Sequence, residues 1–186
     1  MIEISRGNAS QFDEIIDFID FVFSKANSPH DFPTMYPNLY RRTDESMGHM
    51  VNLREDGVLK ASVLCHPRVL NIGGEKLKVY GIGSVATYPH ALGRGFMSTL
   101  MKYIVEEMKK EGVHLSNLGG RRSRYNHFGY EISGNCYGTE LSLDALLKAN
   151  KDIDTDKYAF KALAYEDSDE VEACKAIYDK KPVHYD

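Results

Sequence analysis

The sequence predicts an α/β (α+β) domain in which helices flank a mixed, mainly antiparallel sheet. Two turn dipeptides, Asp56-Gly57 and Gly73-Gly74, separate three runs rich in β-forming residues, a pattern typical of an antiparallel meander. A segment at 95–112 with apolar residues on one side then precedes a short apolar run, and this succession predicts a helix that crosses over to a parallel strand. Because 42% of the 186 residues are apolar, the chain can bury the core of one such domain.

The first elements are a strand, a helix and a loop. A short strand is predicted at 2–5, and Ser10 then opens a helix whose apolar residues recur at helical spacing as far as Phe23. Residues 27–38 hold three of the six prolines, so the helix cannot continue through them and a loop is predicted. Loops of this length often line binding sites. The meander follows, with strands predicted at 49–55, 58–72 and 75–88.

The rest of the domain is predicted to continue from the helix at 95–112, which Gly112 ends. The apolar side of this helix contains Met97, Leu100, Met101, Ile104, Val105 and Met108. A buried strand at 113–118, a short helix and a last strand at 135–143 complete a domain of residues 1–150. Residues 151–186 read as a polar linker followed by a strand at 158–166 and a helix at 167–181, which repeats the opening of the chain.

Composition and charge exclude several classes of function. Lys and Arg number 23 against 27 Asp and Glu, so no overall basic field is available to hold nucleic acid, and the acidic excess falls within 144–186. Cys65, Cys136 and Cys174 show no C-x-x-C spacing, which favours buried thiols in a reducing compartment over a disulfide framework or a metal site. No apolar run is long enough to cross a bilayer or to act as a signal peptide. We therefore expect a cytoplasmic protein without a metal or a membrane segment.

One glycine-rich stretch matches a dinucleotide fingerprint only in letters. Residues 81–86 read G-x-G-x-x-A, but that motif needs a helix to begin inside it, and here β-formers and Pro89 follow. The glycines therefore lie within a strand, where they favour a bulge or a close approach of the backbone.

A second stretch, 89–98, lies between a strand end and the start of the predicted long helix. Gly93 and Gly95 allow the backbone to turn sharply and to come close to a ligand. Unpaired N–H groups and the positive end of the helix dipole favour an anion at this helix start, and Arg94 adds a charge-assisted contact. The alternative is a glycine-containing connection that binds nothing.

A third stretch, 119–124, follows the buried strand and contains Arg121, Arg122 and Arg124. It stands directly before an aromatic segment at 125–130. Taken singly, the arginines are typical of a solvated basic loop.

Together, the segments VATYPHALGRGFMSTLM and RYNHFGYE resemble the GNAT family of acyl-CoA-dependent N-acyltransferases, and most closely its bacterial Eis-like (enhanced intracellular survival) group. The motifs span 85–130, and the order of elements extends the resemblance over 1–143. It implies a GNAT-like sheet with a central strand-loop-helix site for acetyl-CoA. The pantetheine arm would run beside Val85, Ala86 and Thr87. The diphosphate would rest on Gly93, Arg94, Gly95, Phe96, Met97 and Ser98.

The sequence departs from the family pattern in two respects. Leu92 stands where the pattern has Gln or Arg, and Met97 where it has a small residue, although backbone donors survive both changes. The Eis-like group also continues into a second acyltransferase-like half and a further domain. The resemblance therefore implies a protein shortened at its C-terminus, with 158–186 similar to the opening of that second half.

The activity that the resemblance implies is transfer of an acetyl group to a primary amine of a small molecule or peptide, by direct attack on the thioester. Tyr125 would then protonate the departing thiolate. The general base is not identified, since neither His127 nor Cys136 has a partner that would activate it. Asn117 is a candidate to orient the thioester. The candidate acceptor wall consists of His30, Asp31, Phe32 and Tyr36.

Two other functions remain open at this point. One is a non-catalytic acyl-CoA-binding sensor or oligomerisation module, which Leu92 and Met97 favour. The other is nucleic-acid binding through the arginines of 119–124, which the neutral charge of the main domain disfavours. An exposed sheet edge makes a homo-oligomer plausible.

Overall fold

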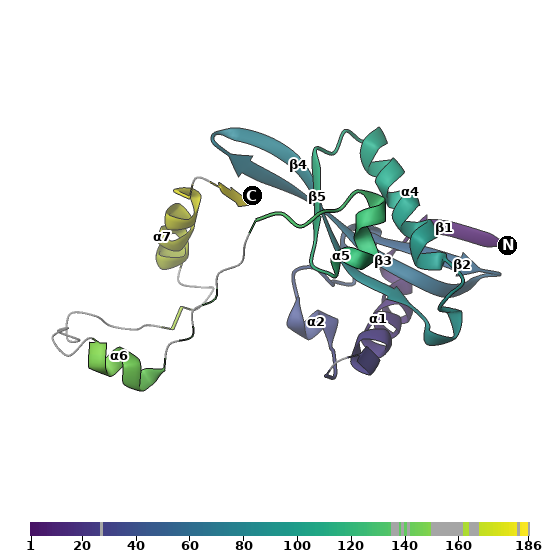
Figure 1. Cartoon of the computed structure of the whole chain (residues 1–186), viewed down its shortest axis with the longest axis horizontal. Coiled ribbons are helices and arrows are strands. Elements are labelled where there is room, and N and C mark those ends of the chain that lie inside the picture. The colour runs from purple at the N-terminus through teal and green to yellow at the C-terminus, as the bar shows by residue number, and fades with distance from the viewer. Residues whose placement is uncertain are drawn as a thin grey trace. The chain divides into compact units, whose positions relative to one another are not determined.

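The computed structural model describes residues 1–26, 28–134, 138, 140, 142–149, 162–163, 168–181 and 183–185. The chain divides into two compact units, of which the first comprises Met1–Glu131 with the C-terminal strand and the second comprises Ile132–Lys181. Figure 1 shows the first unit as a twisted sheet with helices on both faces. No helix in the described ranges has the length and hydropathy that a bilayer crossing requires.

The sheet of the first unit confirms the predicted mixed, mainly antiparallel class. Its strands are ordered β1-β2-β3-β4-β5, with only β4 and β5 parallel. Their bounds are Ile2–Arg6, Met50–Glu55, Val58–Ile72, Glu75–Thr87 and Leu115–Leu118. An additional strand, β6 (Val183–Tyr185), pairs with β3 at Leu70–Ile72 and was not predicted. The three strands of the predicted meander thus form with their expected bounds to within a residue.

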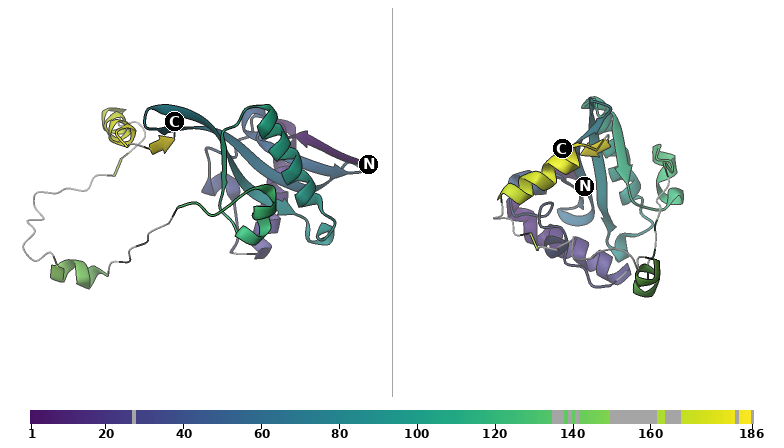
Figure 2. Two further views of the ribbon diagram at one scale, coloured as in Figure 1. Left: turned by 45° about the horizontal axis from the view of Figure 1, so that its top comes forward. Right: turned by 90° about the vertical axis from the view of Figure 1, so that its left-hand side faces the viewer.

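The helices of the first unit are α1 (Phe12–Ala26), α2 (Phe32–Met35), α3 (Asp44–Gly48), α4 (Phe96–Lys110) and α5 (Arg122–Tyr125). Figure 2 shows α1 and α4 on opposite sides of the sheet. The two long helices were predicted, although Asn8 rather than Ser10 caps the turn that leads into α1, since its side chain accepts from the Ser10 N–H. The predicted loop at 27–38 contains α2, because Asp31 caps that helix and a proline is tolerated in the first turn.

The second unit contains α6 (Leu143–Ala149) and α7 (Ser168–Asp179). The helix predicted at 167–181 is thus present as α7. The predicted strands at 135–143 and 158–166 fall largely outside the described residues, and Leu143 begins a helix instead. Cys174 on α7 is exposed, contrary to the expectation of buried thiols, because α7 has almost no buried surface; Cys65 is buried as expected.

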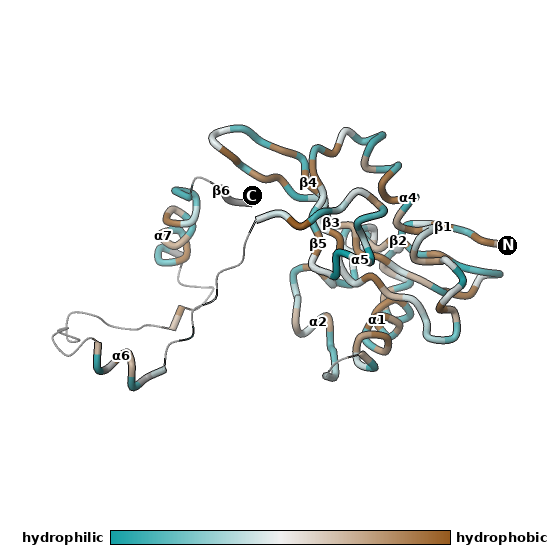
Figure 3. Tube along the Cα trace, in the orientation of Figure 1, coloured by the Kyte–Doolittle hydropathy of each residue, from teal (hydrophilic) through white to brown (hydrophobic). Residues whose placement is uncertain are grey.

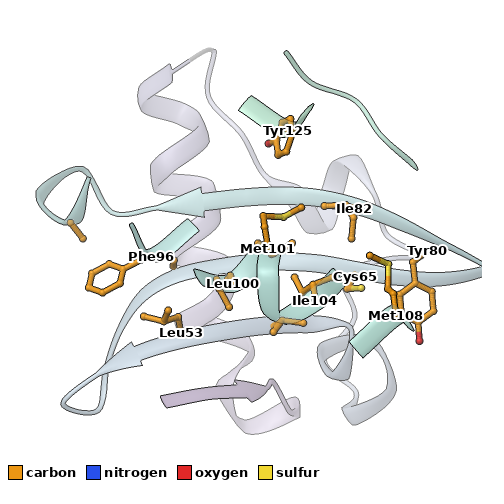
Figure 4. Close-up of a cluster of buried hydrophobic side chains, with 14 residues drawn as sticks. Leu53, Cys65, Tyr80, Ile82, Phe96, Leu100, Met101, Ile104, Met108 and Tyr125 are labelled. Atoms are coloured by element: carbon orange, nitrogen blue, oxygen red, sulfur yellow. The ribbon is translucent and has the colours of Figure 1, made fainter. Parts of the chain in front are cut away.

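Each face of the sheet has its own core. One core joins α1 to the sheet through side chains such as Phe18, Ile19 and Met50, and the other joins α4 to it through Leu100 and Ile104. Figure 3 shows the apolar residues concentrated in the strands and helices of this unit, and Figure 4 shows the α4 core, with Tyr125 at one edge. Each fully buried aliphatic or aromatic side chain stabilises the fold by roughly 1.5–3 kcal/mol. Most of the predicted apolar side of α4 is in this core, whereas Met97 and Val105 are only partly buried.

Candidate functional site

The site begins where β4 leaves β5. The two strands pair from Val79 with Leu115 to Ile82 with Leu118, and β4 then continues to Thr87 without β5. The side chains of Val85 and Thr87 line a cavity, whereas Ala86 between them packs into the α1 core. This alternation follows from the two-residue period of a strand. The last residues of β4 therefore present a free backbone edge and two side chains to the cavity.

A bulge shapes this end of β4. The register with β3 shifts between Ser62 and Leu64, so that β4 carries one extra residue, and Ser84 there has a φ of 41°. Such a conformation costs about 1–3 kcal/mol outside glycine. The Tyr40 hydroxyl hydrogen-bonds to the Ser84 hydroxyl, which helps to hold the bulge, and burial raises the pKa of Tyr40 to about 12. Tyr40 therefore stays a neutral hydrogen-bonding group at any physiological pH.

The turn between β4 and α4 provides the predicted glycine conformations. Gly93 and Gly95 have φ values of 76° and 78°, a region that favours glycine, and Gly95 is the N-cap of α4. As a glycine, Gly95 has no side chain with which to cap this helix start. The N–H groups of its first turn, from Phe96 to Ser98, consequently lack intrahelical partners and form, with the helix dipole, a favourable environment for an anion.

One cavity of about 620 Å³ connects these parts, and we call it the main cavity. Its lining comes from α1, the end of β4, the turn, the start of α4, and α5 with the residues after it. The lining residues are Val22, Lys25, Ala26, Val85, Thr87, Pro89, Leu92, Met97, Ser98, Arg124, Tyr125 and His127. A smaller cavity of about 300 Å³ lies along the turn and shares Thr87, Leu92, Met97 and Ser98 with the main one. Gly93, Gly95 and Phe96 line only this smaller cavity.

Tyr125 enters the main cavity from the C-terminal end of α5. Its ring is buried in the α4 core and packs on Gly120, where an added Cβ would lie 2.6 Å from Cε2 of the ring. Burial raises the pKa of the Tyr125 hydroxyl, against a smaller opposite effect of the Arg124 charge. Within the described residues this hydroxyl makes no hydrogen bond. It is therefore a protonated phenol with its donor available to a ligand in the cavity.

The structure brings together most of the predicted coenzyme-binding residues. Val85, Thr87, Met97 and Ser98 line the main cavity together with Tyr125, the predicted acid, and Gly93, Gly95 and Phe96 line the smaller cavity. The side chains of Ala86 and Phe96 instead lie in the two cores, so that only their backbones are available to a ligand. Arg94 lines neither cavity, because its guanidinium binds the Glu55 carboxylate and lies over the Phe96 ring.

The candidate acceptor residues lie outside both cavities. Asp31 caps α2 and accepts hydrogen bonds from the backbone N–H and hydroxyl of Thr34. Tyr36 is half-exposed and stacks on Phe32, and Asn117 is exposed and accepts a hydrogen bond from Arg68. Of the two candidate bases, His127 lines the main cavity, whereas Cys136 lies outside the described residues.

The sequence analysis did not predict that two charged residues, Lys25 and Arg124, line the main cavity. Lys25 is in the last turn of α1, 60 residues or more before the glycine motif, and no local pattern connects the two. Arg124 stands directly before Tyr125, and this closeness in the sequence to the predicted acid was the available signal.

Comparisons with known proteins identify the family and the fold. A family model described as an acetyltransferase (GNAT) domain matches residues 3–133. A probable N-acyltransferase from Enterococcus faecalis V583 is similar in structure, with a TM-score of 0.59 and 24% identity over 70% of this chain and 32% of that one. A GNAT family acetyltransferase from Brucella melitensis in complex with acetyl-CoA has a TM-score of 0.56 and 19% identity, over 71% of this chain and 84% of that one.

Eis1 from Mycobacterium abscessus is also similar, with a TM-score of 0.56 and 16% identity over 72% of this chain and 32% of Eis1. The chain thus spans about a third of the length of the Enterococcus and Mycobacterium proteins. A search of curated proteins finds no significant match.

Proposed function

Since the chain belongs to the acetyltransferase (GNAT) domain family, we propose that it binds acetyl-CoA in the main cavity and transfers the acetyl group to a primary amine. One observation carries the proposal: the end of β4, the start of α4 and Tyr125, which come from separate parts of the sequence, line one cavity. A volume of about 620 Å³ is in the range of small-molecule and cofactor sites.

The residues present fit the parts of the coenzyme. The free edge of β4 beyond Ile82 offers backbone N–H and C=O groups to the amides of the pantetheine arm, as to an added strand. The uncapped start of α4 offers N–H groups to the diphosphate. The apolar side chains of Val85 and Met97 would cover the arm, and its thioester would point along β4 toward Tyr125.

The chemistry is a direct transfer. The neutral amine forms a bond to the thioester carbonyl carbon, the C–S bond then breaks, and the proton lost by the amine passes to solvent or to a base. The sulfur leaves as a thiolate, which accepts the proton of the Tyr125 hydroxyl, and the tyrosinate regains a proton from solvent. Because burial raises its pKa, Tyr125 holds that proton at neutral pH until the thiolate forms.

The acceptor is assigned here only by class. Asp31 and Tyr36 cap the two ends of α2, and they remain the candidates for the acceptor wall. The Phe32 N–H, which donates to Asp20 of α1 at 2.9 Å, fixes α2 to α1. Asn117, at the end of the β4 and β5 pairing, remains the candidate to orient the thioester. A small-molecule or peptide amine is the expected partner.

The finer assignments are part of the same proposal. Membership of the Eis-like group is supported by the glycine and tyrosine motifs and by the likeness to Eis1. Residues 1–150 would form the acyltransferase domain, and 151–186 the linker and the strand-helix start of a second half. We also propose a cytoplasmic location and self-association through an exposed sheet edge.

The second candidate function is an acyl-CoA-binding module without turnover. Leu92, 65% exposed and lining both cavities, favours it because the family pattern has a polar side chain there.

Nucleic-acid binding is disfavoured further, because Arg122 is paired with Glu131.

Two measurements on the full chain decide between these functions. Calorimetry with acetyl-CoA measures binding, and a thiol reagent measures CoA release with a panel of primary amines. Binding with saturable, amine-dependent CoA release supports the transferase. Binding with no release for any amine supports the module, and no binding overturns both.

A further inference from the structure

Arg94, the arginine of the turn that leads into α4, is engaged in an ion pair. Arg94 donates from Nη1 to Glu55 Oε2 at 2.7 Å and from Nη2 to Glu55 Oε1, and its guanidinium lies 4.7 Å from the centre of the Phe96 ring. The Arg94 guanidinium holds the pKa of the Glu55 carboxyl below its usual range, so the pair is neutral overall at physiological pH. With Leu92 in the turn as well, neither side chain supplies a cation to a bound diphosphate.

Two cationic side chains from other elements, Lys25 and Arg124, line the main cavity. Lys25 is in the last turn of α1 and Arg124 is on α5, and no acidic side chain among the described residues lines the cavity. Lys25 Nζ lies 4.8 Å from the centre of the Phe21 ring. Within the described residues neither Lys25 nor Arg124 forms an ion pair, in contrast to Arg122 on the same short helix.

We propose that Lys25 and Arg124 neutralise the diphosphate of coenzyme A, in place of the arginine of the turn. This inference rests on the proposed function and adds the residues that determine its coenzyme affinity. Ser98, whose N–H belongs to the first turn of α4, lines the same cavity as both cations. The backbone donors of α4 and two cations from α1 and α5 then line the same cavity, and together they would bind a group of two negative charges.

The solvent exposure of Lys25 and Arg124 limits how much each contributes to the affinity for acetyl-CoA. Lys25 is exposed and Arg124 is on the surface of α5, so water screens both charges and each contact is weaker than a buried ion pair. Loss of one cation is expected to raise the Kd for acetyl-CoA about tenfold, and loss of both about fiftyfold. Because the lost contacts with the diphosphate are electrostatic, the dependence of Kd on salt concentration should weaken in each single variant and weaken further in the double variant.

The experiment compares K25A, R124A and the double variant with R122A as a matched control. R122A removes an equal charge from α5 but lines neither cavity. Calorimetry at several NaCl concentrations measures the Kd for CoA and for 3′-dephospho-CoA, which keeps the diphosphate and lacks the third phosphate. Thermal melting verifies that each variant is folded, and R124K, which retains the charge, should restore most of the affinity.

The expected result is an equal loss of affinity for both ligands in K25A and R124A and none in R122A. A loss seen with CoA but not with 3′-dephospho-CoA would place the cations at the 3′-phosphate and overturn the proposal. An unchanged Kd, or an effect confined to the KM of the amine, would overturn it as well. Failure of the unaltered chain to bind either ligand would instead contradict the proposed function.

Discussion

Replacing Tyr125 by phenylalanine separates chemistry from folding. The hydroxyl makes no hydrogen bond within the described residues, and the ring keeps its place in the α4 core, so the free energy of unfolding should change by less than about 0.5 kcal/mol. If the hydroxyl protonates the thiolate, however, its loss removes a general acid, which is worth about 10²- to 10⁴-fold in kcat. That range corresponds to roughly 2.7–5.4 kcal/mol of activation free energy.

Tyr130 provides a matched control in the same cluster. Its ring centre lies 6.4 Å from that of Tyr125, it lines neither cavity, and its hydroxyl lies 2.7 Å from Ser116 Oγ. Because Ser116 already donates to the Tyr80 carbonyl at 3.0 Å, the Tyr130 hydroxyl is the donor of this bond. Tyr130→Phe should therefore lower the free energy of unfolding by about 1 kcal/mol, or Tm by about 2–4 °C, with kcat unchanged.

The two variants are measured in parallel by urea unfolding and by amine-dependent release of CoA. Calorimetry should show that Tyr125→Phe binds acetyl-CoA within about twofold of the unaltered chain, since the diphosphate and pantetheine contacts remain. A Tyr125→Phe variant that keeps its kcat within threefold for every accepted amine would refute the role of the phenol. If Tyr125→Phe lowers kcat and the free energy of unfolding together, the inference that the hydroxyl acts in catalysis and not in folding is refuted.

Three further perturbations test other parts of the site and the fold. Gly120→Ala places a Cβ 2.6 Å from the Tyr125 ring and should lower kcat about tenfold with little change in Kd, which steady-state kinetics and calorimetry measure. Gly95→Ala has open space around its Cβ, so its cost of about 1 kcal/mol in urea unfolding comes from the φ of 78° alone, and the Kd for CoA should rise. Arg54 holds the pKa of Glu14 below its ordinary 4.5 through a hydrogen bond, so this pair stabilises above that pH and its contribution is lost as pH falls through the folded-state value. Glu14→Gln should be less stable by about 0.5 kcal/mol at pH 7, and thermal melts should show the difference shrinking as the pH falls below 4.5.

Periodic patterns in the sequence were sufficient for the long elements. Helices α1 and α4 and the meander of β2 to β4 each extend over several repeats of their pattern, so the signal accumulates. The short helix predicted after the strand at 113–118 is present as α5, whereas the short helices α2 and α3 were missed because four or five residues hold no full repeat. Their caps were present in the sequence all the same, since Thr43 accepts from the Ser46 N–H and Asp31 from the Thr34 N–H.

The site was predictable where backbone conformation determines it. The glycines of the turn and the strand before it could be located from the sequence, because positive φ and strand alternation are local properties. The partner of Arg94 was not predictable, since Glu55 stands 39 residues earlier and only the sheet brings the two together. The approach of Lys25 to the cavity depends in the same way on how α1 packs.

The pairing of Arg94 with Glu55 and the presence of Lys25 in the main cavity are related. A diphosphate carries two negative charges, and the start of α4 offers it only partial positive charge from N–H groups and the helix dipole. Because Arg94 is paired with Glu55, it does not neutralise the diphosphate. The positive charge that the diphosphate still requires then has to come from other side chains of the main cavity, which Lys25 and Arg124 line. The turn is then required only to keep its backbone conformation, which the two glycines ensure, and a leucine at position 92 is compatible with binding. A polar residue restored at that position should consequently add little affinity while both cavity cations are present, and more once they are removed.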